Sequence, residues 1–324
     1  MKIMITGLSG NLSSALVKAF PENKFKFNSK DCTFSKIEVP FTYDVKYKKE
    51  LDIRNRAKID KYMQTKPDII IHTAAYVNTN RCEEDTIGAF KTNVEGTFNL
   101  VDSMCKYSPD SLFVNLCTTA TMDPSCYSLE NPLTETTKQN PQTWYGQTKI
   151  LAEEIVKKRC KRWINLFPVF LFGNIPLDSS SMVNITAYNT MHNMNTIIKL
   201  DPKIHKMWEY VYNFVPVLRN IILNKEAENQ DIVIAGSSPK TFQQFLDICQ
   251  DKFKSIFNKE LIYTLEPQGD YLKNHIADNS KMLRLANMTE KQFNENRITF
   301  EQGIEESYKC LKKLLSVELN TKNK

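Results

Sequence analysis

Apolar runs of strand length alternate with longer segments of helical period along the first half of the chain. The apolar runs predict strands at 2–6, 24–28, 68–75, 111–118 and 163–173. Apolar residues at helical spacing predict helices at 11–20, 53–66, 83–108 and 144–160. Apolar strands separated by helices are typical of a parallel sheet that is covered on both faces. The pattern therefore predicts a doubly wound α/β fold.

The alternation becomes less regular after Gly173. A polar stretch at 174–196 is followed by an apolar segment at 206–224, a strand-like run at 231–236 and helices beginning near 241 and 300. At 324 residues the chain exceeds the usual size of one hydrophobic core. We expect a main α/β domain over 1–173 and a smaller lobe over 174–324, with some segments of the lobe returning to the main domain.

Composition and charge narrow the class of protein. Hydrophobic residues make up 41% of the chain, and no uncharged apolar run reaches the ~18 residues that a membrane span needs. The N-terminus enters an apolar strand without the regions of a signal peptide, and the net charge of +6 is spread along the chain. Eight cysteines without a CxxC pair predict neither a metal site nor a disulfide framework. We expect a cytoplasmic protein that binds neither membrane nor nucleic acid.

A glycine-bearing turn, "TGLSGNLSSAL", follows the first predicted strand. In a parallel α/β sheet such a turn lets the backbone approach a pyrophosphate, which then lies on the amides of the next helix. A plain turn would use the same glycines, but the place of Gly7 and Gly10 after the first strand favours a dinucleotide-binding Rossmann domain over 1–173. Ser13 stands where a third glycine would permit close helix packing, so we expect it to affect packing more than phosphate contact.

A Tyr-x-x-x-Lys pair places a phenol and an ammonium on one face of a helix. The pattern occurs at Tyr62/Lys66, Tyr145/Lys149 and Tyr308/Lys312, as chance alone would allow in a chain rich in both residues. Only Tyr145/Lys149 lies on a helix that follows a strand ending in hydroxyl residues, with Thr118 at the expected carboxyl edge of the sheet. Ligands of open α/β sheets bind at that edge. A purely structural role of Thr118 stays open.

With these motifs in this order, the chain resembles the extended short-chain dehydrogenase/reductases. Within them it is similar to dTDP-4-dehydrorhamnose reductases and related nucleotide-sugar 4-keto reductases. The matching segments are "MKIMITGLSGNLSSAL", "ELDIRN", "KPDIIIHTAAYVNTNRCEED", "AFKTNVEGTFNLV", "FVNLCTTATMD", "YGQTKILAEE" and "ADNSKM". The resemblance is nearly continuous over 1–173 and thin beyond it, where it implies a substrate-binding lobe.

The resemblance implies catalytic roles for Thr118, Tyr145 and Lys149. It also implies a cofactor site that includes Gly7, Ser9, Gly10, Asn11, Leu12, Lys30, Asp52, Ile53, Ala74, Ala75, Tyr76, Asn93, Tyr145 and Lys149. In this set Asp52 and Ile53 belong to the adenine pocket, and Asn93 has a structural or a proton-relay role. The Lys149 ammonium favours the phenolate of Tyr145. Because a basic residue suits a 2′-phosphate, Lys30 after the second predicted strand favours NADPH, with NADH left open.

Two departures from the family pattern keep the activity open. Cys117-Thr118-Thr119 replaces the usual Ser-Thr-Asp, and "NLFPVFLFG" lacks the arginine often found near the cofactor. The first hypothesis is NAD(P)H-dependent reduction of a nucleotide-linked 4-keto-6-deoxy sugar. The alternative is a catalytically silent NADP-binding regulatory subunit that docks a partner enzyme. A dehydratase or an epimerase is less favoured, since dehydratases usually have an acid where Thr119 stands. A homodimer is left open.

Overall fold

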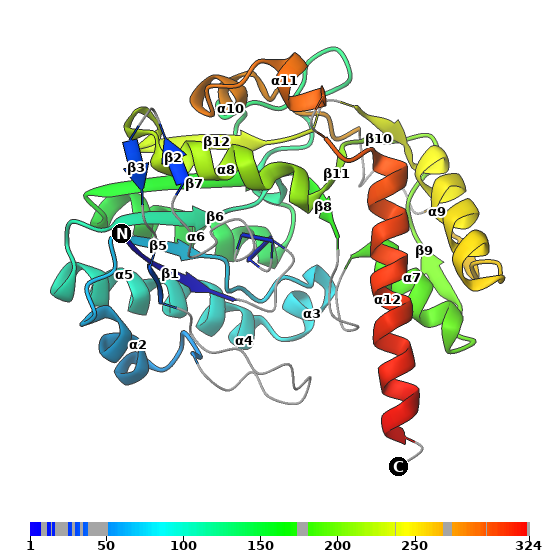
Figure 1. The fold of residues 1–324 in the computed structure, drawn as a ribbon, viewed down its shortest axis with the longest axis horizontal. Coiled ribbons are helices and arrows are strands. Elements are labelled where there is room, and N and C mark those ends of the chain that lie inside the picture. The colour runs from blue at the N-terminus through cyan, green and yellow to red at the C-terminus, as the bar shows by residue number, and fades with distance from the viewer. Residues whose placement is uncertain are drawn as a thin grey trace.

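A six-stranded parallel sheet forms the centre of the described part of the chain (Figure 1). The computed structural model describes residues 1–7, 12–13, 15–16, 25–27, 30–32, 35–37, 51–173, 181–236, 238–267, 274–295 and 297–322. The strands are β1 (Lys2–Thr6), β4 (Ser35–Ile37), β5 (Ile69–His72), β6 (Leu112–Leu116), β7 (Arg162–Pro168) and β12 (Gln230–Ile234). Their order in the sheet is β12-β7-β6-β5-β1-β4, with every neighbouring pair parallel. The predicted doubly wound Rossmann-like fold is confirmed.

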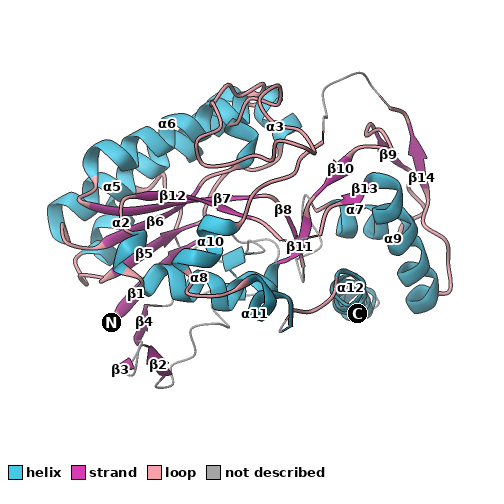
Figure 2. Cartoon of the chain, turned by 90° about the horizontal axis from the view of Figure 1, so that it is seen from above, coloured by secondary structure: helices cyan, strands magenta, loops and turns pink. Residues whose placement is uncertain are grey.

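Helices cover both faces of the sheet (Figure 2). One face packs against α2 (Arg56–Met63), α5 (Gly96–Tyr107) and α6 (Trp144–Arg159), and the other against α8 (Phe214–Leu223) and α10 (Ser280–Leu285). Alternate strand residues point to opposite faces, so Ile3 and Ile5 join the core below α8 while Met4 joins the core below α5. Both faces are apolar, which explains why these strands read as continuous apolar runs.

The strand predicted at 24–28 is not a strand of the central sheet. Residues Phe25–Phe27 form β2, which pairs antiparallel with β3 (Lys30–Cys32) in a separate hairpin. The place beside β1 belongs to β4, with Met4 opposite Ile37. Lys30 therefore lies in the hairpin and not at the end of the second strand of the sheet.

The helix predicted over 83–108 is broken into shorter pieces. They are α3 (Thr79–Glu84), α4 (Thr86–Phe90), a π-helical turn η1 (Lys91–Glu95) and α5. The Asp85 side chain accepts a hydrogen bond from the Gly88 amide at 2.8 Å, and so starts α4 anew. A helical period alone cannot show such a break, because the apolar spacing continues through it.

Most of the remaining elements build a second layer around its own core. They are β8 (Phe170–Phe172), α7 (Met182–Met191), β9 (Thr196–Ile198), β10 (His205–Lys206), β11 (Trp208–Tyr210), β13 (Lys240–Thr241), α9 (Phe242–Phe257), β14 (Tyr263–Leu265) and α12 (Phe300–Lys322). Phe172, Phe245 and Tyr308 are among the buried residues of this core. In contrast, α11 (Glu290–Glu295) and the 3-10 turns η3 (Val211–Asn213) and η4 (Lys225–Ala227) contribute Phe293, Val211 and Ala227 to the core below α8, and the 3-10 turn η2 (Thr119–Thr121) follows β6. The strand predicted at 163–173 is thus divided, since β7 lies in the central sheet and β8 pairs with β11. In the other direction, β12 returns from the second half of the chain to pair with β7.

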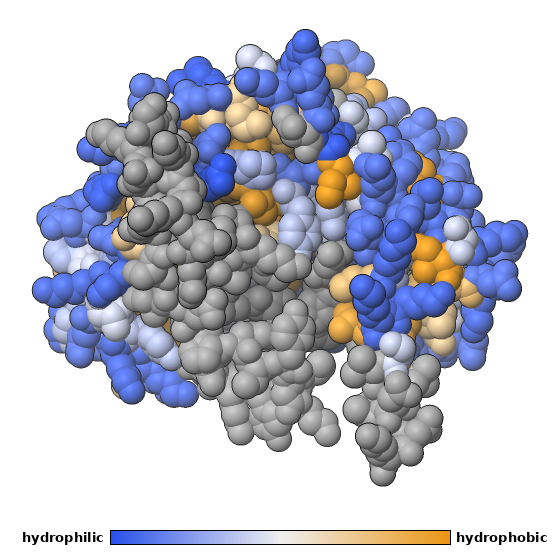
Figure 3. Space-filling model, viewed as in Figure 1, coloured by the Kyte–Doolittle hydropathy of each residue, from blue (hydrophilic) through white to orange (hydrophobic). Residues whose placement is uncertain are grey.

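The described surface is largely hydrophilic on the face shown in Figure 3, with apolar side chains in small patches such as those beside α12. Among the described residues, no helix is both long and apolar enough to cross a membrane.

Candidate active site

The carboxyl ends of the central strands bring the turn after β1, the turn after β5 and the end of β6 together. In the sheet register Thr6 lies opposite His72, and His72 lies opposite Asn115. The strand order also changes direction at β1, since β4 lies on one side of it and β5 on the other. Open α/β sheets bind their ligands at such an edge.

Gly7 allows the first two of these turns to approach closely. Its φ is +71°, a left-handed conformation that favours glycine. A Cβ atom on Gly7 would lie 2.6 Å from the Ala74 nitrogen and 2.9 Å from the Thr73 carbonyl carbon. Ala74, Ala75 and Tyr76 follow β5 and are partly exposed. The two turns are therefore in backbone contact, with no room for a side chain between them.

Ser13 takes part in the same turn. Its hydroxyl donates a hydrogen bond of 2.5 Å to the Gly7 carbonyl, and the residue is fully buried. Where a third glycine would let the helix pack closely, Ser13 is buried and its hydroxyl bonds the turn instead. Leu12 is buried in the core between sheet and helix. Ser9, Gly10 and Asn11 lie outside the described residues, as does the side chain of Lys30.

Ile53 is buried in the core, whereas the neighbouring Asp52 is partly exposed. Ile53 is buried, and a Cβ atom on Gly96 would lie 2.6 Å from its side chain, so it packs against the start of α5. The Asp52 carboxylate is partly exposed and binds Arg54 at 2.7 Å. This hydrogen bond lowers the pKa of Asp52.

Thr118 and Tyr145 lie in contact. Thr118 caps η2, accepting a hydrogen bond from the Ala120 amide at 3.2 Å, and its side chain lies close enough to the Tyr145 phenol to lower the pKa of that group. Tyr145 lies in the first turn of α6, whose N-cap is Thr143. Burial raises the pKa of Tyr145, and the bond from Thr118 opposes this rise. The phenol is therefore held protonated at neutral pH, in contrast to the lowered pKa expected beside an ammonium.

Lys149 follows one turn later on the same helix. Its Nζ atom donates a hydrogen bond of 2.6 Å to the Leu116 carbonyl, at the end of β6, and the residue is 4% exposed. Burial lowers the pKa of Lys149, while Cys117 and Glu153 act in the opposite direction. Tyr145 and Lys149 thus reach the edge of the sheet from α6.

The other two Tyr-x-x-x-Lys pairs lie elsewhere. Tyr62 lies on α2 and packs at the margin of the core between that helix and the sheet, and Lys66 is exposed. Tyr308 is buried in the second core, and Lys312 donates a hydrogen bond to the Ile256 carbonyl. Of the three pairs, Tyr145/Lys149 is the one that the structure brings to Thr118.

Thr119 belongs to a buried neutral cluster that the sequence did not reveal. Its hydroxyl lies 3.3 Å from the Pro168 carbonyl, to which it donates, and 2.9 Å from Nε2 of His275. The Tyr127 hydroxyl lies 3.1 Å from Nδ1 of the same imidazole. Burial, and then the charge of Lys206, lower the pKa of His275 to about 3. The available signal was the position of His275 two residues before the matching segment "ADNSKM".

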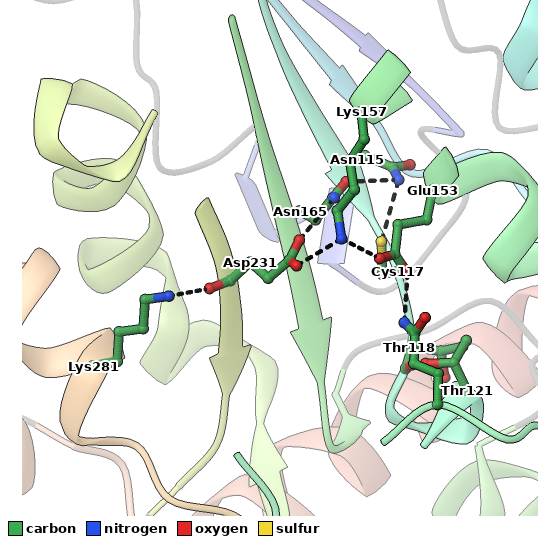
Figure 4. A network of polar contacts seen from close by, with 10 residues as sticks. Asn115, Cys117, Thr118, Thr121, Glu153, Lys157, Asn165, Asp231 and Lys281 are labelled. Atoms are coloured by element: carbon green, nitrogen blue, oxygen red, sulfur yellow. Dashed lines mark hydrogen bonds and ion pairs between the residues drawn. The ribbon is translucent and has the colours of Figure 1, made fainter. Parts of the chain in front are cut away.

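A charged network anchors the later turns of α6 (Figure 4). Lys157 Nζ lies 2.5 Å from Glu153 Oε1 and 2.7 Å from Asp231 Oδ2. Asn165 donates to Asp231 at 2.9 Å, and Asn115 donates to Asn165 at 3.1 Å. The bonds to the two carboxylates outweigh burial and raise the pKa of Lys157 to about 12. The network joins α6 to β6, β7 and β12.

The structure places Gly7, Ala74, Thr118, Tyr145 and Lys149 at or near the carboxyl edge of the central sheet. Among the described residues, no group of three or more His, Cys, Asp or Glu side chains could hold a metal ion. Cys117, beside this site, is buried, and burial raises the pKa of its thiol well above the usual value.

Comparison with known proteins agrees with this fold. Residues 1–190 match the family described as the RmlD substrate binding domain, and the chain belongs to that family. It is 22% identical over 279 residues to a putative UDP-glucose 4-epimerase of Methanocaldococcus jannaschii, covering 83% of this chain and 87% of the relative. It is 24% identical over 173 residues to a dTDP-4-dehydrorhamnose reductase of Aggregatibacter actinomycetemcomitans, covering 53% of this chain and 52% of the relative.

A similar fold occurs in solved structures. The structure of RMD from Pseudomonas aeruginosa complexed with NADPH aligns with a TM-score of 0.74 and 14% identity, over 96% of this chain and 99% of that one. The resemblance places the chain among nucleotide-sugar-modifying short-chain dehydrogenase/reductases, an oxidoreductase-like enzyme family.

Proposed function

We propose that the protein reduces a nucleotide-linked 4-keto-6-deoxy sugar, with a nicotinamide dinucleotide as the hydride donor. The contact between Thr118 and Tyr145 at the carboxyl edge of the sheet, with Lys149 one turn further along α6, carries this proposal. These are the hydroxyl, phenol and ammonium groups that carbonyl reduction needs. A relative named dTDP-4-dehydrorhamnose reductase supports the choice of a 4-keto sugar.

The residues at the sheet edge fit a dinucleotide. The close approach of Gly7 to the Ala74 backbone, which leaves no room for a Cβ atom, is typical of a turn whose backbone meets a pyrophosphate. Gly7, the backbone of Ala74–Tyr76 and the Lys149 ammonium would hold the cofactor. RMD of the same fold was solved with NADPH, which supports a nicotinamide cofactor for this chain.

The choice between NADPH and NADH depends on the second strand of the sheet. An acid at its end favours the free ribose hydroxyl of NADH, and a base favours the 2′-phosphate of NADPH. Lys30 lies in the β2–β3 hairpin, whereas the residue after β4 in the sequence is an acid, Glu38. We therefore propose that NADH serves at least as well as NADPH. A tenfold preference of the wild type for NADPH that disappears in Lys30→Ala would reverse this proposal.

The side chains supply the proton of the reaction. When bound, the nicotinamide supplies a hydride to the carbonyl carbon of the sugar. Tyr145 is protonated at neutral pH and donates its proton to the carbonyl oxygen, while burial, which raises the pKa of Tyr145, opposes this transfer. The Thr118 hydroxyl, which lowers the pKa of the phenol, stabilises the negative charge that remains on Tyr145.

Thr119 favours reduction over dehydration. Elimination of water needs an acid beside the sugar, and this position holds a hydroxyl that is buried and bonded to Pro168 and His275. Epimerisation remains the competing reaction, because the Methanocaldococcus relative carries the name of an epimerase. Reduction consumes the reduced cofactor, whereas epimerisation returns it.

The test is incubation with NADPH or NADH and a panel of UDP- and dTDP-linked 4-keto-6-deoxyhexoses, followed by mass spectrometry. We expect a product two mass units heavier with equal loss of cofactor. Tyr145→Phe should lower turnover by ~10²–10⁴-fold with little change in cofactor affinity. Lys149→Ala should weaken cofactor binding as well, and Thr118→Val should lower turnover alone.

Tyr62→Phe and Tyr308→Phe are the matched controls, since both share the Tyr-x-x-x-Lys spacing away from the site. Equal loss of turnover in these variants and in Tyr145→Phe would reject the assignment of Tyr145. Conversion of a UDP- or dTDP-hexose that carries a 4-hydroxyl into its 4-epimer, in the presence of NAD⁺ and without net change of the cofactor, would replace the reductase by an epimerase. No turnover, together with cofactor binding and a stoichiometric partner protein, would establish the silent regulatory subunit.

A further inference from the structure

Lys206, in the short strand β10, carries a buried ammonium group. The residue is 3% exposed, and its Nζ atom lies 4.2 Å from the centre of the Phe170 ring. Within the described part of the chain, no carboxylate lies close enough to pair with this Nζ atom, and no oxygen accepts a hydrogen bond from it. The positive charge therefore meets the face of an aromatic ring but no counter-charge.

Lys240 shows what a paired lysine looks like in the same place. It lies directly opposite Lys206 in the pair of strands β10 and β13. Its Nζ atom also lies over an aromatic ring, 5.3 Å from the centre of Phe300, but it has the Glu301 carboxylate at 3.8 Å as well. The Lys240 side chain is 23% exposed, so water also reaches it. Lys206 has neither this carboxylate nor this exposure.

The unpaired ammonium of Lys206 costs the folded protein free energy. Burial removes water from the charge, and no opposite charge replaces that water. Burial also lowers the pKa of Lys206 to about 8, so most molecules keep the proton at pH 7. A methionine would fill a similar volume without this cost. A buried charge that folding does not need indicates a role in binding.

Phe170 and His275 connect Lys206 to the candidate active site. Phe170 begins β8, just beyond the end of β7, and is 38% exposed. The ring centres of Phe170 and His275 lie 5.2 Å apart, and Nε2 of His275 lies 2.9 Å from the Thr119 hydroxyl. Thr119 directly follows Thr118 in the sequence. The Lys206 ammonium therefore lies near the same edge of the sheet as the proposed catalytic hydroxyl.

The order of the strands separates Lys206 from the proposed cofactor site. The turns after β1 and β5 lie on one side of β6, and β7, which leads to Phe170, lies on the other. Strands β8 and β10 lie between the central sheet and α9 (Figures 1 and 2). A cofactor on the first two turns and a substrate carbonyl at Thr118 leave the side of β7 for the rest of the substrate. We expect Lys206 to meet a part of the substrate that points away from the cofactor.

The groups around Lys206 indicate the chemistry of its missing partner. The neighbouring imidazole of His275 is neutral, and the hydroxyls of Thr119 and Tyr127 are both bonded to it. None of these groups carries a negative charge. The oxyanions of phosphates and carboxylates form strong charge-assisted hydrogen bonds with an ammonium. A nucleotide-linked sugar carries a diphosphate, and its sugar ring can carry a carboxylate.

We propose that Lys206 binds an oxyanion of the substrate, which supplies the counter-charge that this lysine lacks in the free protein. The diphosphate of the nucleotide and a carboxylate on the sugar are the two sources of this group. The inference rests on the proposed function for the class of ligand, a nucleotide-linked sugar, but it requires no reaction. Binding of unreactive nucleotides therefore tests it separately from turnover.

The first measurement is calorimetric binding of uridine, UDP, UDP-glucose and UDP-glucuronate, with the thymidine series in parallel, to wild type, Lys206→Met and Lys240→Met. If the diphosphate is the partner, the wild type should bind UDP about 10–100-fold more tightly than uridine. If a carboxylate is the partner, the same preference should separate UDP-glucuronate from UDP-glucose. Lys206→Met should lose most of the preference, and Lys240→Met should keep it, because its ammonium already has Glu301.

The outcomes separate this inference from the proposed reaction. Preferences that are unchanged in Lys206→Met, or lost equally in Lys240→Met, would overturn the assignment of Lys206. Failure of the wild type to bind any probe of either series would overturn it as well. A preference that depends on Lys206, without reduction of any 4-keto sugar, would support the oxyanion site and reject the proposed function alone.

The second measurement is thermal unfolding, which separates binding from a structural role. Because Lys206 is buried without a counter-charge, Lys206→Met should leave the Tm of the ligand-free protein unchanged or raise it. Saturating UDP, or UDP-glucuronate if the carboxylate is the partner, should then raise the Tm of the wild type more than that of the variant. A fall in Tm larger than that of Lys240→Met would mean that the ammonium stabilises the fold, and would contradict the proposal.

A second variant and a kinetic measurement protect the test against a folding failure of Lys206→Met. Lys206→Arg keeps the charge, so it should keep more of the nucleotide preference than the methionine variant does. Equal losses in the two variants would contradict the role of the charge. In steady-state reduction, Lys206→Met should raise KM for the sugar about 10–100-fold and change kcat less than about threefold, because the bound oxyanion is remote from the reacting carbon. A loss of kcat at constant KM would contradict this binding role.

Discussion

Two polar networks hold helix α6, and they differ in charge. The neutral network consists of Thr6, His72, Thr97, Asn93 and Thr148, and it ends on the turn that bears Tyr145 and Lys149. The charged network consists of Glu153, Lys157 and Asp231 with Asn165 and Asn115, and it binds the later turns of the same helix to the sheet.

The two networks differ in charge because only the neutral one reaches the turn that bears Tyr145 and Lys149. Charges close to Tyr145 and Lys149 would shift their pKa values, so neutral groups can fix this turn without changing its titration. Burial, and then the Lys149 charge, lower the pKa of His72 to about 3 and keep it neutral. Four residues beyond Lys149, Glu153 is paired with Lys157; its charge still raises the pKa of Lys149, against the larger lowering by burial. One helix is thus positioned by neutral bonds and anchored by charges.

The largest expected effect on stability is the loss of the central cation of the charged network. Lys157→Met leaves the buried Glu153 and the partly exposed Asp231 without their counter-charge, which should cost about 3 kcal/mol. Urea unfolding at neutral pH measures this loss. Lys158→Met is the matched control, because Lys158 is the exposed neighbour on the same helix. A loss below about 1 kcal/mol would mean that the network does not anchor α6.

Removing both partners should cost less than the single losses together. The double variant Glu153→Gln with Lys157→Met no longer buries an unpaired carboxylate at position 153. We expect a coupling free energy of about 1–3 kcal/mol in a double-mutant cycle. The four unfolding free energies of the cycle give this value directly. Additive losses would show that the two side chains act independently.

Acid should affect the neutral clusters through their histidines. The pKa values of His72 and His275 are about 3 in the folded protein and 6.5 without the fold's influence. The unfolded chain binds more protons between these values, so the stabilisation is complete above pH 6.5 and is lost as pH falls towards 3. Each histidine should contribute a slope of about 1.4 kcal/mol per pH unit over much of this range.

Urea unfolding between pH 7 and pH 5 checks this slope. In His72→Gln the dependence of the unfolding free energy on pH should be less steep by the contribution of one histidine, about 1.4 kcal/mol per pH unit. His192→Gln, at an exposed position, should leave it unchanged. An equally steep slope in His72→Gln would show that His72 is not buried in its neutral form.

The smallest expected effect concerns an ion pair on the surface. Lys161 lies 3.2 Å from Asp110, but the two side chains are 67% and 86% exposed. Asp110→Asn should change the unfolding free energy by less than ~0.5 kcal/mol, because water screens the pair. Comparing this loss of unfolding free energy with that of Lys157→Met shows whether an ion pair stabilises the protein through its charge alone or only when it is buried. A loss as large as that of Lys157→Met would assign the effect to charge alone.

The central sheet could be predicted because its determinants are local. Runs such as Ile69–Ile71 are apolar on both faces, and helices of the right length separate them. The candidate site followed from the same order, since Gly7, Thr118 and Tyr145 stand at the ends of successive elements. Their roles in binding and catalysis stay predictions, although the structure brings Thr118, Tyr145 and Lys149 together.

The predictions from sequence were wrong where the structure depends on contacts between residues far apart in the chain. The strand beside β1 was placed at 24–28, because those residues are more apolar than 35–37, but pairing with β1 selected β4. The helix over 83–108 kept its apolar period through the π-helical turn, whose asparagine is fixed by Tyr76 and Thr148. His275 meets Thr119 across 156 positions of the sequence, a contact that no local pattern encodes.

The sequence by itself determined the layers of this protein and the order of its glycine turn, hydroxyl, phenol and ammonium, because these depend on local hydrophobic periodicity and on residue types at element ends. Tertiary structure alone decided which hydroxyls face one another, that His72 is neutral, and which ions hold α6. Those properties depend on burial and on hydrogen-bond partners far apart in the sequence, which exist only once the chain has folded.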